Sequence, residues 1–145
     1  MTAKSRSSSL TASDKLTSAN EDYLEAIYQL GSLGTMPVRS VDLATKLDVS
    51  KASVNKALST LKRAGLVEQP HYGDITLTDD GREYASSILD RHHVLYHFLI
   101  DVLRVEPAVA AEEACIMEHA ISDDTLRRWT DFLKGHFRDI MTVDA

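Results

Sequence analysis

Residues 37–67 read PVRSVDLATKLDVSKASVNKALSTLKRAGLV and contain two short amphipathic patterns on either side of a brief break. Apolar residues recur at helical spacing in both patterns, so each predicts a helix. The break is Asp48-Val49-Ser50. Ser50 can cap the second helix and Gly65 can end it, because serine accepts backbone N–H groups and glycine tolerates left-handed geometry. Two helices joined by so tight a turn are typical of a helix-turn-helix, whose second helix enters the DNA major groove.

The residues that follow predict the wing of a winged helix. Two short β-prone runs, at residues 66–69 and 75–78, are separated by the turn-forming residues 70–74, which is the pattern of a β-hairpin. Helical spacing and capping residues predict the other elements. They are a first helix over residues 20–30 capped by Asn20 and ended by Gly31, a long helix from Thr78 to about Val102, a helix from Pro107 to about Ile121, and a helix from Ser122 through Phe137.

The expected fold is mainly α with a small β-hairpin wing. Residues 1–19 are rich in serine, threonine and alanine and should form a disordered tail. Residues 20–78 should form an N-terminal winged helix-turn-helix. Residues 79–145 should form a second, helical domain, since a chain of 145 residues is long enough for two small domains.

Charge is distributed unevenly along the chain. The sequence carries 16 Lys and Arg against 22 Asp and Glu, a formal net charge of -6, which argues against a uniformly basic nucleic-acid coat. Residues 37–66 nevertheless carry a net charge of +4, and residues 101–145 carry a net charge of -5. The local basic surplus suggests a surface that faces a polyanion, and ordinary solvated helix surface is the alternative.

The single cysteine, Cys115, excludes an internal disulfide. The first twenty residues contain no apolar run typical of a signal peptide, and nowhere do about 18 consecutive apolar residues form a candidate membrane span. We therefore expect a cytoplasmic protein without a membrane partner. Under that expectation Cys115 is reduced, and is either an inert core thiol or a site residue.

The amino end of the second helix of the helix-turn-helix carries small and hydrogen-bonding side chains, with cations around it. A protein that reads DNA needs small and hydrogen-bonding side chains to contact base edges, and it needs cations to contact phosphates. A winged helix used for protein contacts is the alternative interpretation. The residues expected at base edges are Ser50, Ala52, Ser53, Asn55 and Lys56, and the expected phosphate contacts are Arg39, Lys51, Lys62 and Arg63.

Side chains that can bind a metal lie beside the apolar stripes of two predicted helices. Asp22 and Glu25 are three residues apart in the first helix and share a face. Cys115, Glu118 and His119 stand at i, i+3 and i+4 and also share a face. We expect that face to adjoin the core residues Ala114, Ile116 and Ile121. A thiol, a carboxylate and an imidazole are three ligand types for a divalent transition metal.

His92 and His93 on the long helix are further candidates, of which one should face inward and the other solvent. Each candidate alone has an ordinary interpretation, as a core thiol, a surface charge or a satisfied core histidine. Buried near one another without a cation, Asp22, Glu25 and Glu118 would lose hydration and repel, and a metal removes that penalty. Taken together, the residues predict a metal site.

Three segments resemble, in order, the diphtheria toxin repressor family of metal-dependent transcriptional repressors: EDYLEAIYQL at residues 21–30, DRHHVLYHFL at residues 90–99 and EEACIMEHAISDD at residues 112–124. The resemblance covers roughly residues 20–137 and is to the short, two-domain branch that includes the manganese transport regulators. It implies that the second domain binds metal and dimerises. It also implies a homodimer that binds double-stranded operator DNA of metal-homeostasis genes when Mn(II) or Fe(II) is bound.

The resemblance further implies a ligand set for one or two ions per subunit. Cys115 stands where manganese regulators of the short branch have Glu and iron regulators have Cys, whereas Asp22 stands where the iron type usually has Met. Tyr96 and Ala111 replace the residues of the iron type's ancillary site, which should therefore be absent. Oxygen ligands favour Mn(II) and a thiolate favours Fe(II), Zn(II) or Co(II), so we prefer Mn(II) and keep Fe(II) open. The implied ligands are Asp22, Glu25, His92, Cys115, Glu118 and His119.

Two other classes of function use the same residues. A winged-helix regulator would sense oxidation through Cys115, or an organic ligand between its helices, without a metal. Replacing Glu118 or His119 distinguishes a thiol sensor from a metal sensor, because a thiol sensor should keep its response after the change and a metal sensor should lose it. A metalloenzyme is the third class, but the sequence has no phosphate-binding Gly-rich loop and no nucleophile-elbow motif. We therefore expect no enzymatic activity.

Overall fold

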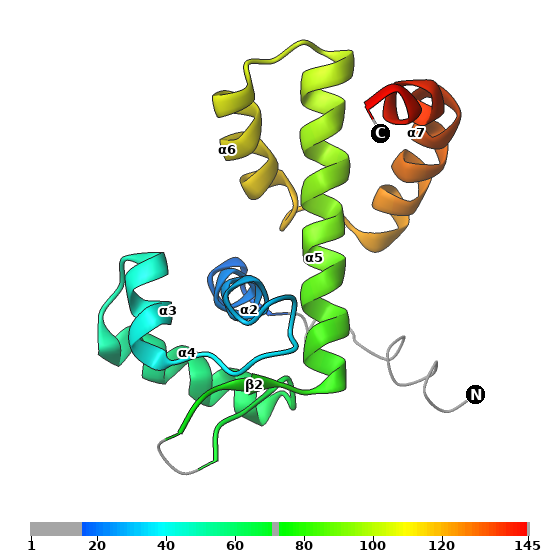
Figure 1. Cartoon of the computed structure of the whole chain (residues 1–145). Helices are drawn as coiled ribbons and strands as arrows, with labels where there is room; N and C mark the ends of the chain where they lie inside the picture. The colour runs from blue at the N-terminus through cyan, green and yellow to red at the C-terminus, as the bar shows by residue number, and fades with distance from the viewer. Residues whose placement is uncertain (1–15, 71–72, 145) are drawn as a thin grey trace, which may run out of the picture. The chain divides into compact units, whose positions relative to one another are not determined.

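A computed structural model gives the structure of residues 16–70 and 73–144, and the chain divides after Ser87 into two compact units (Figure 1). Most of the predicted tail, residues 1–15, lies outside the described residues. The mainly α fold with a two-stranded sheet is confirmed. In chain order the elements are α2 (Ser18–Leu30), α3 (Ser40–Leu47), α4 (Lys51–Arg63), β1 (Val67–Glu68), β2 (Thr76–Leu77), α5 (Asp79–His97), the π-helical turn η1 (Phe98–Val102), α6 (Pro107–Met117) and α7 (Asp123–Asp144).

In the first unit, α2 packs against the two helices of the helix-turn-helix. Leu24 and Ile27 of α2, Leu43 of α3 and Leu58 of α4 are almost completely buried, and this apolar burial stabilises the three-helix arrangement. The predicted cap of α2 was wrong. The helix begins two residues before Asn20, because the side chain of Thr17 accepts the hydrogen bond of the Asn20 N–H at 3.2 Å.

The second helix of the helix-turn-helix has the cap and the end that the sequence predicted. Asp48 ends α3 in the left-handed region, at φ 55°, which aspartate tolerates better than bulkier residues. Ser50 caps α4, because its hydroxyl accepts the Ser53 N–H at 3.1 Å. Gly65 follows α4 at φ 76°, where an L side chain would be strained.

The wing is a shorter hairpin than the sequence predicted. Strands β1 and β2 are antiparallel and two residues long, with Val67 opposite Leu77 and Glu68 opposite Thr76. The ladder stops there because Ile75 pairs with Val38 instead, through hydrogen bonds of 2.8 and 2.7 Å. At the tip of the hairpin, residues 71–72 lie outside the described residues.

In the second unit, α6 and α7 lie on either side of α5 (Figure 1). The core consists of Leu95, Leu99, Ala110 and Ala114. Trp129 of α7 packs against the same cluster. Alanine presents little bulk, so the backbone of α6 can lie close to its neighbour.

Two predictions for this unit were wrong at the level of single elements. Helix α6 ends at Met117 instead of continuing to about Ile121, because Ser122 caps the next helix by accepting the Thr125 N–H at 3.1 Å. Ile116, expected in the core, is 67% exposed. Among the described residues, no helix is both long and apolar enough to cross a membrane.

Candidate metal centre and nucleic-acid interface

The end of α6 brings two predicted ligands next to a third on α5. Nδ1 of His92 lies 2.9 Å from Oε1 of Glu118, and Sγ of Cys115 lies 3.8 Å from the same nitrogen. One ligand atom from each of the three residues falls within 4.8 Å of the other two. The structure thus brings the thiol and the carboxylate of the expected face together with the imidazole of His92 from α5.

The spacing of these atoms is suitable for a metal ion. Zinc-type distances of about 2.0–2.3 Å to nitrogen, oxygen and sulfur put neighbouring ligand atoms of a tetrahedron about 3.5 Å apart. The observed separations of 2.9 and 3.8 Å lie on either side of that value. Small side-chain adjustments would therefore be enough for all three to coordinate one ion.

Glu118 provides an independent indication of a cation. Its residue is 1% exposed, and its Oε2 atom makes no hydrogen bond with any described residue. A buried carboxylate oxygen without a donor is unfavourable, and such groups usually have a role. A cation is the partner that would satisfy this oxygen, so the residues present fit a bound metal.

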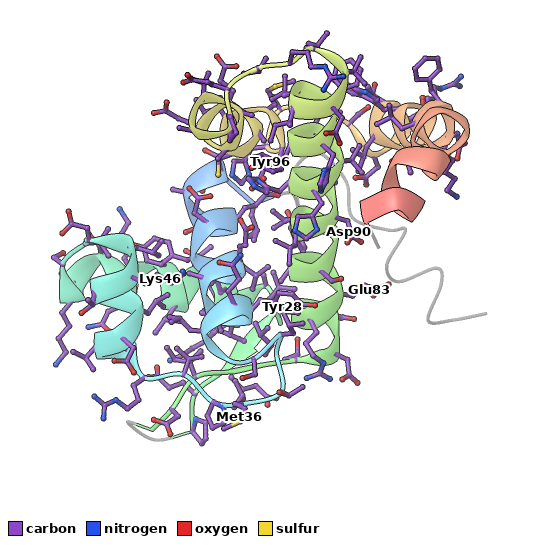
Figure 2. All side chains as sticks on the ribbon, turned by 45° about the horizontal axis from the view of Figure 1, so that its top comes forward. Tyr28, Met36, Lys46, Glu83, Asp90 and Tyr96 are labelled. Atoms are coloured by element: carbon purple, nitrogen blue, oxygen red, sulfur yellow. The ribbon has the colours of Figure 1, made fainter. Side chains whose placement is uncertain are left out.

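Of the two adjacent histidines on α5, one faces the cluster and the other faces solvent, as the sequence predicted. The side chain of His92 is 20% exposed and reaches Glu118, whereas His93 is exposed. His119 is 10% exposed, and its Nε2 atom lies 3.5 Å from Oε2 of Glu118. The ring of His92 is stacked on that of Tyr96 with centroids 6.0 Å apart, and Figure 2 shows Tyr96 on the side of α5 that carries α6.

The remaining two predicted ligands belong to the first unit. Asp22 is exposed on α2 and Glu25 is half-buried one turn further along the same helix. Residues three apart on a helix share a face, so the structure confirms that both carboxylates lie on neighbouring positions of one helix surface.

A buried carboxylate beside them was not predicted from the sequence. Glu21 is 1% exposed, and its Oε2 atom accepts a hydrogen bond of 2.6 Å from the hydroxyl of Tyr84 on α5. The same hydroxyl accepts the Leu16 N–H at 3.3 Å. The available signal was position, because Glu21 stands three residues before the buried Leu24 and shares its face.

A buried arginine was missed as well. Arg91 on α5 is 6% exposed, and its guanidinium forms an ion pair with the carboxylate of Asp123, the first residue of α7. Its Nε atom has no hydrogen-bond partner among the described residues. Arg91 directly precedes the candidate ligand His92, so the pair adjoins the cluster along the chain.

The candidate DNA-contacting side chains all lie on the surface of the first unit. Ser50 also has a structural task, since it caps α4 and donates a hydrogen bond to Oγ of Ser53 at 3.1 Å. Arg39 lies 3.6 Å from Asp42 in an exposed ion pair, which is weak and easily exchanged for a phosphate. The exposed residues are Arg39, Ser50, Lys51, Ala52, Ser53, Asn55, Lys56, Lys62 and Arg63.

Two family models match consecutive parts of the chain. One describes the iron dependent repressor, N-terminal DNA binding domain, and matches residues 15–75. The other describes the iron dependent repressor, metal binding and dimerisation domain, and matches residues 78–139. Together with the winged helix and the cluster of candidate ligands, these matches define a metal-dependent transcriptional repressor, a class without enzymatic activity.

Relatives identify the family more closely. A helix-turn-helix transcriptional regulator of Methanocaldococcus jannaschii is 39% identical over 82% of this chain and 94% of that protein. The transcriptional regulator MntR of Escherichia coli is 36% identical over 80% of this chain and 74% of that protein. The iron-dependent repressor IdeR of Mycobacterium tuberculosis is 32% identical over 84% and 53%. The chain therefore belongs to the iron-dependent repressor family, which includes the diphtheria toxin repressor.

Solved structures agree with this assignment. The manganese regulator SloR is 31% identical, with a TM-score of 0.69 over 79% of this chain and 53% of that protein. ScaR with bound Zn2+ is 28% identical, with a TM-score of 0.68 over 79% and 53%. The chain spans about half the length of these two proteins.

Proposed function

We propose that the protein is a cytoplasmic repressor that binds double-stranded operator DNA as a homodimer when Mn(II) or Fe(II) is bound, and that it controls genes of metal homeostasis. The observation that carries the proposal is the cluster of His92, Cys115 and Glu118, in which a buried carboxylate oxygen lacks a hydrogen-bond donor. The exposed, basic helix α4 of the same chain would bind the operator DNA.

The ligand set of this proposal draws on both units. His92, Cys115 and Glu118 form its part in the second unit, together with the adjacent His119. Asp22 and Glu25 supply the carboxylates of the first unit. A divalent ion contributes the positive charge that allows several carboxylates to stay ionised at one place, and one or two ions per subunit fit this number of ligands.

The ligand types limit the metal without selecting one. Three carboxylates favour Mn(II), whereas the Cys115 thiolate favours Fe(II), Zn(II) or Co(II). Affinity alone rises from Mn(II) to Zn(II) in most sites, so the physiological ion depends on what the cell makes available. We retain Mn(II) as the first candidate and Fe(II) as the second.

On the DNA side, α4 would enter the major groove with its amino end toward the bases. Ala52, Ser53, Asn55 and Lys56 are then within reach of base edges, while Ser50 fixes the start of the helix as its cap. The other exposed cations would contact phosphates, which gives affinity that falls steeply with salt. Their arrangement on one segment explains why an acidic chain binds a polyanion.

A homodimer reads two half-sites about 34–36 Å apart, so the spacing of its recognition helices decides affinity. Ligands contributed by both units would restrict that spacing when they share an ion. Shifting a two-state equilibrium from 1:99 to 99:1 requires about 5.5 kcal/mol of preferential binding. By linkage, operator DNA must in turn tighten metal binding.

A binding titration tests the proposal. A duplex is selected from random-sequence DNA with the wild-type protein in Mn(II), and its affinity is then measured by fluorescence anisotropy with Mn(II) and with a chelator at one fixed salt concentration. We expect the chelator to raise the apparent Kd at least tenfold. Equal affinity under the two conditions contradicts the proposal.

Adjacent histidines provide a matched pair of variants for this titration. His92→Phe removes a ligand from the cluster, whereas His93→Phe makes the same change at the next, exposed residue of α5. Only the first should abolish the response to Mn(II). A metal response that survives in His92→Phe would remove this residue from the site.

The exposure of Cys115 favours a second candidate function, in which the thiol senses oxidation. The neighbouring imidazole at 3.8 Å would support a reactive thiolate. In that case hydrogen peroxide should change DNA affinity in the metal-free protein, and Cys115→Ser should abolish the change. A response to peroxide that requires bound Mn(II) would instead identify the metal site as the sensor.

A further inference from the structure

Arg91 has an unusual environment for an arginine. It is 6% exposed in the second unit, its ion-pair partner is Asp123, and its Nε atom lacks a hydrogen-bond partner among the described residues. The side chain of Asp123, in contrast, is 84% exposed. A buried cation is thus paired with a carboxylate that remains largely in water.

Stability alone gives no reason for this pair. Removing a guanidinium from water costs several kcal/mol, and its attraction to a partly solvated carboxylate returns only part of that. Replacing such pairs with apolar residues is often neutral or stabilising. A role other than stability is therefore the natural explanation, and the position of the pair suggests one.

The ion pair lies at the end of the segment that carries two candidate ligands. Residues 118–122 connect α6 to α7, and Glu118 and His119 are the first two of them. On one side, α6 is held by the packing of its alanines on Leu95 of α5 and Leu99 of η1. On the other side, Arg91 holds the first residue of α7.

Both anchors of the segment therefore converge on α5 close to His92, which follows Arg91 directly. Figure 2 labels Asp90 and Tyr96, the residues between which Arg91 and His92 lie on α5. Ile121 of the connection and Trp129 of α7 also pack against the core of this unit. Without the ion pair, the start of α7 would rely on this apolar packing. Glu118 and His119 would then sample positions away from His92.

We propose that Arg91 and Asp123 are positioning residues of the metal site, because their ion pair holds residues 118–122 in the arrangement that coordination needs. This inference rests on the proposed function for the role of Glu118 and His119 as ligands. Residues that orient metal ligands typically change metal affinity by about 10–100-fold when replaced. We expect a loss in that range for Asp123→Asn.

Asp124→Asn is the matched control. Asp124 is the neighbouring acidic residue in the first turn of α7, and it pairs with Arg127 and Arg128 on its own helix. Both substitutions remove one carboxylate from the amino end of the same helix, so they change the helix-dipole interaction alike. Only Asp123→Asn removes the contact with Arg91.

The experiment measures Co(II) binding to the full chain by visible absorption. Co(II) bound to a thiolate and an imidazole has ligand-field and charge-transfer bands, which report on affinity and on geometry at the cluster. Urea denaturation of the metal-free proteins measures stability separately. Asp123→Asn should weaken Co(II) binding about 10–100-fold relative to Asp124→Asn, with the two metal-free proteins equally stable.

Equal Co(II) affinities for the two variants would overturn the inference. So would a loss of metal-free stability in Asp123→Asn large enough to account for weaker binding, because the pair would then be structural. Wild type that binds Co(II) without any change in DNA affinity would instead refute the proposed function and leave the positioning role standing. Wild type that does not bind Co(II) would refute both.

A double-substitution cycle tests whether the two residues act together. Arg91→Met keeps a long side chain without the charge, and it is combined with Asp123→Asn. If the pair acts as a unit, each single change and the double change weaken Co(II) binding by similar factors. Factors that multiply in the double variant would show that the residues act independently and would overturn the proposal.

Discussion

Replacing Glu118 with glutamine is the most direct test of the buried carboxylate. Glu118→Gln keeps the size and shape of the side chain and removes its charge. The variant loses the carboxylate that lies 2.9 Å from His92, but it also no longer buries an ionised group with an unpartnered oxygen. The two consequences for metal-free stability have opposite signs.

Their magnitudes are comparable. A hydrogen bond to a charged group contributes about 1.5–3 kcal/mol, and burying a carboxylate costs several kcal/mol before its partners offset part of it. We expect a net change within about 1 kcal/mol, or about 3 °C in Tm for a chain of this length. The metal-bound protein behaves differently. At a free Mn(II) concentration 100 times the Kd, binding adds about 2.7 kcal/mol, which corresponds to about 8 °C in wild type.

Thermal unfolding followed by circular dichroism, with Mn(II) and with a chelator, measures both quantities. Glu113→Gln is the control, since Glu113 is an exposed carboxylate on α6 five residues earlier. Wild type and Glu113→Gln should show the shift of about 8 °C with Mn(II), and Glu118→Gln should show almost none. A shift of wild-type size in Glu118→Gln would refute the reasoning that Glu118 is a ligand.

Three further substitutions test other parts of the molecule. Asn55→Ala should lower the discrimination at one base pair by about 1–3 kcal/mol without changing the salt dependence of DNA binding. Operator variants with single-base changes measure this discrimination. A uniform loss of affinity across all sequences would show that Asn55 contacts a phosphate instead. Cys115→Glu should raise the affinity for Mn(II) relative to Co(II) by about tenfold or more, as measured by competition, and an unchanged ratio would show that the thiolate does not coordinate. Tyr84→Phe should leave Glu21 buried without its hydroxyl donor and lower the free energy of unfolding, measured in urea, by about 1–3 kcal/mol. Tyr28→Phe, at the partly buried tyrosine of α2, is the control and should have little effect. Equal losses in the two variants would contradict the importance of the hydrogen bond.

The helix-turn-helix was predictable because its signals are local. Ser50 caps the helix that it directly precedes, and Gly65 follows the helix that it ends. Asp48 tolerates the left-handed turn without any distant contact. In contrast, the end of α6 and the exposure of Ile116 were predicted wrongly, because they depend on where α7 begins and on which neighbours α6 contacts, and neither is encoded within the helix itself.

The metal-ligand candidates were predictable for a different reason. Their residue types are chemically distinctive, and helical spacing predicted that Cys115 and Glu118 lie close together. The imidazole of their cluster belongs to His92 of α5, and not to the expected His119. The positioning residues were not predictable in this way. Arginine and glutamate are usually on the surface, so a position on an apolar helix face, which Glu21 shares with Leu24, does not identify either residue as buried until its distant partner is known.

Three charged residues are buried among those that the structure describes, namely Glu21, Arg91 and Glu118. Glu21 accepts a short hydrogen bond from Tyr84, and Arg91 is paired with Asp123, so the protein itself supplies an ion-pair or hydrogen-bond partner to each. Glu118 differs, because one oxygen faces His92, whereas the other lies 3.5 Å from Nε2 of His119 and makes no hydrogen bond with a described residue. A buried carboxylate oxygen without a hydrogen bond is costly, and an imidazole and a thiol are themselves metal ligands. A cation therefore accounts for all three side chains at once, whereas a purely structural role leaves one oxygen of Glu118 without a hydrogen bond.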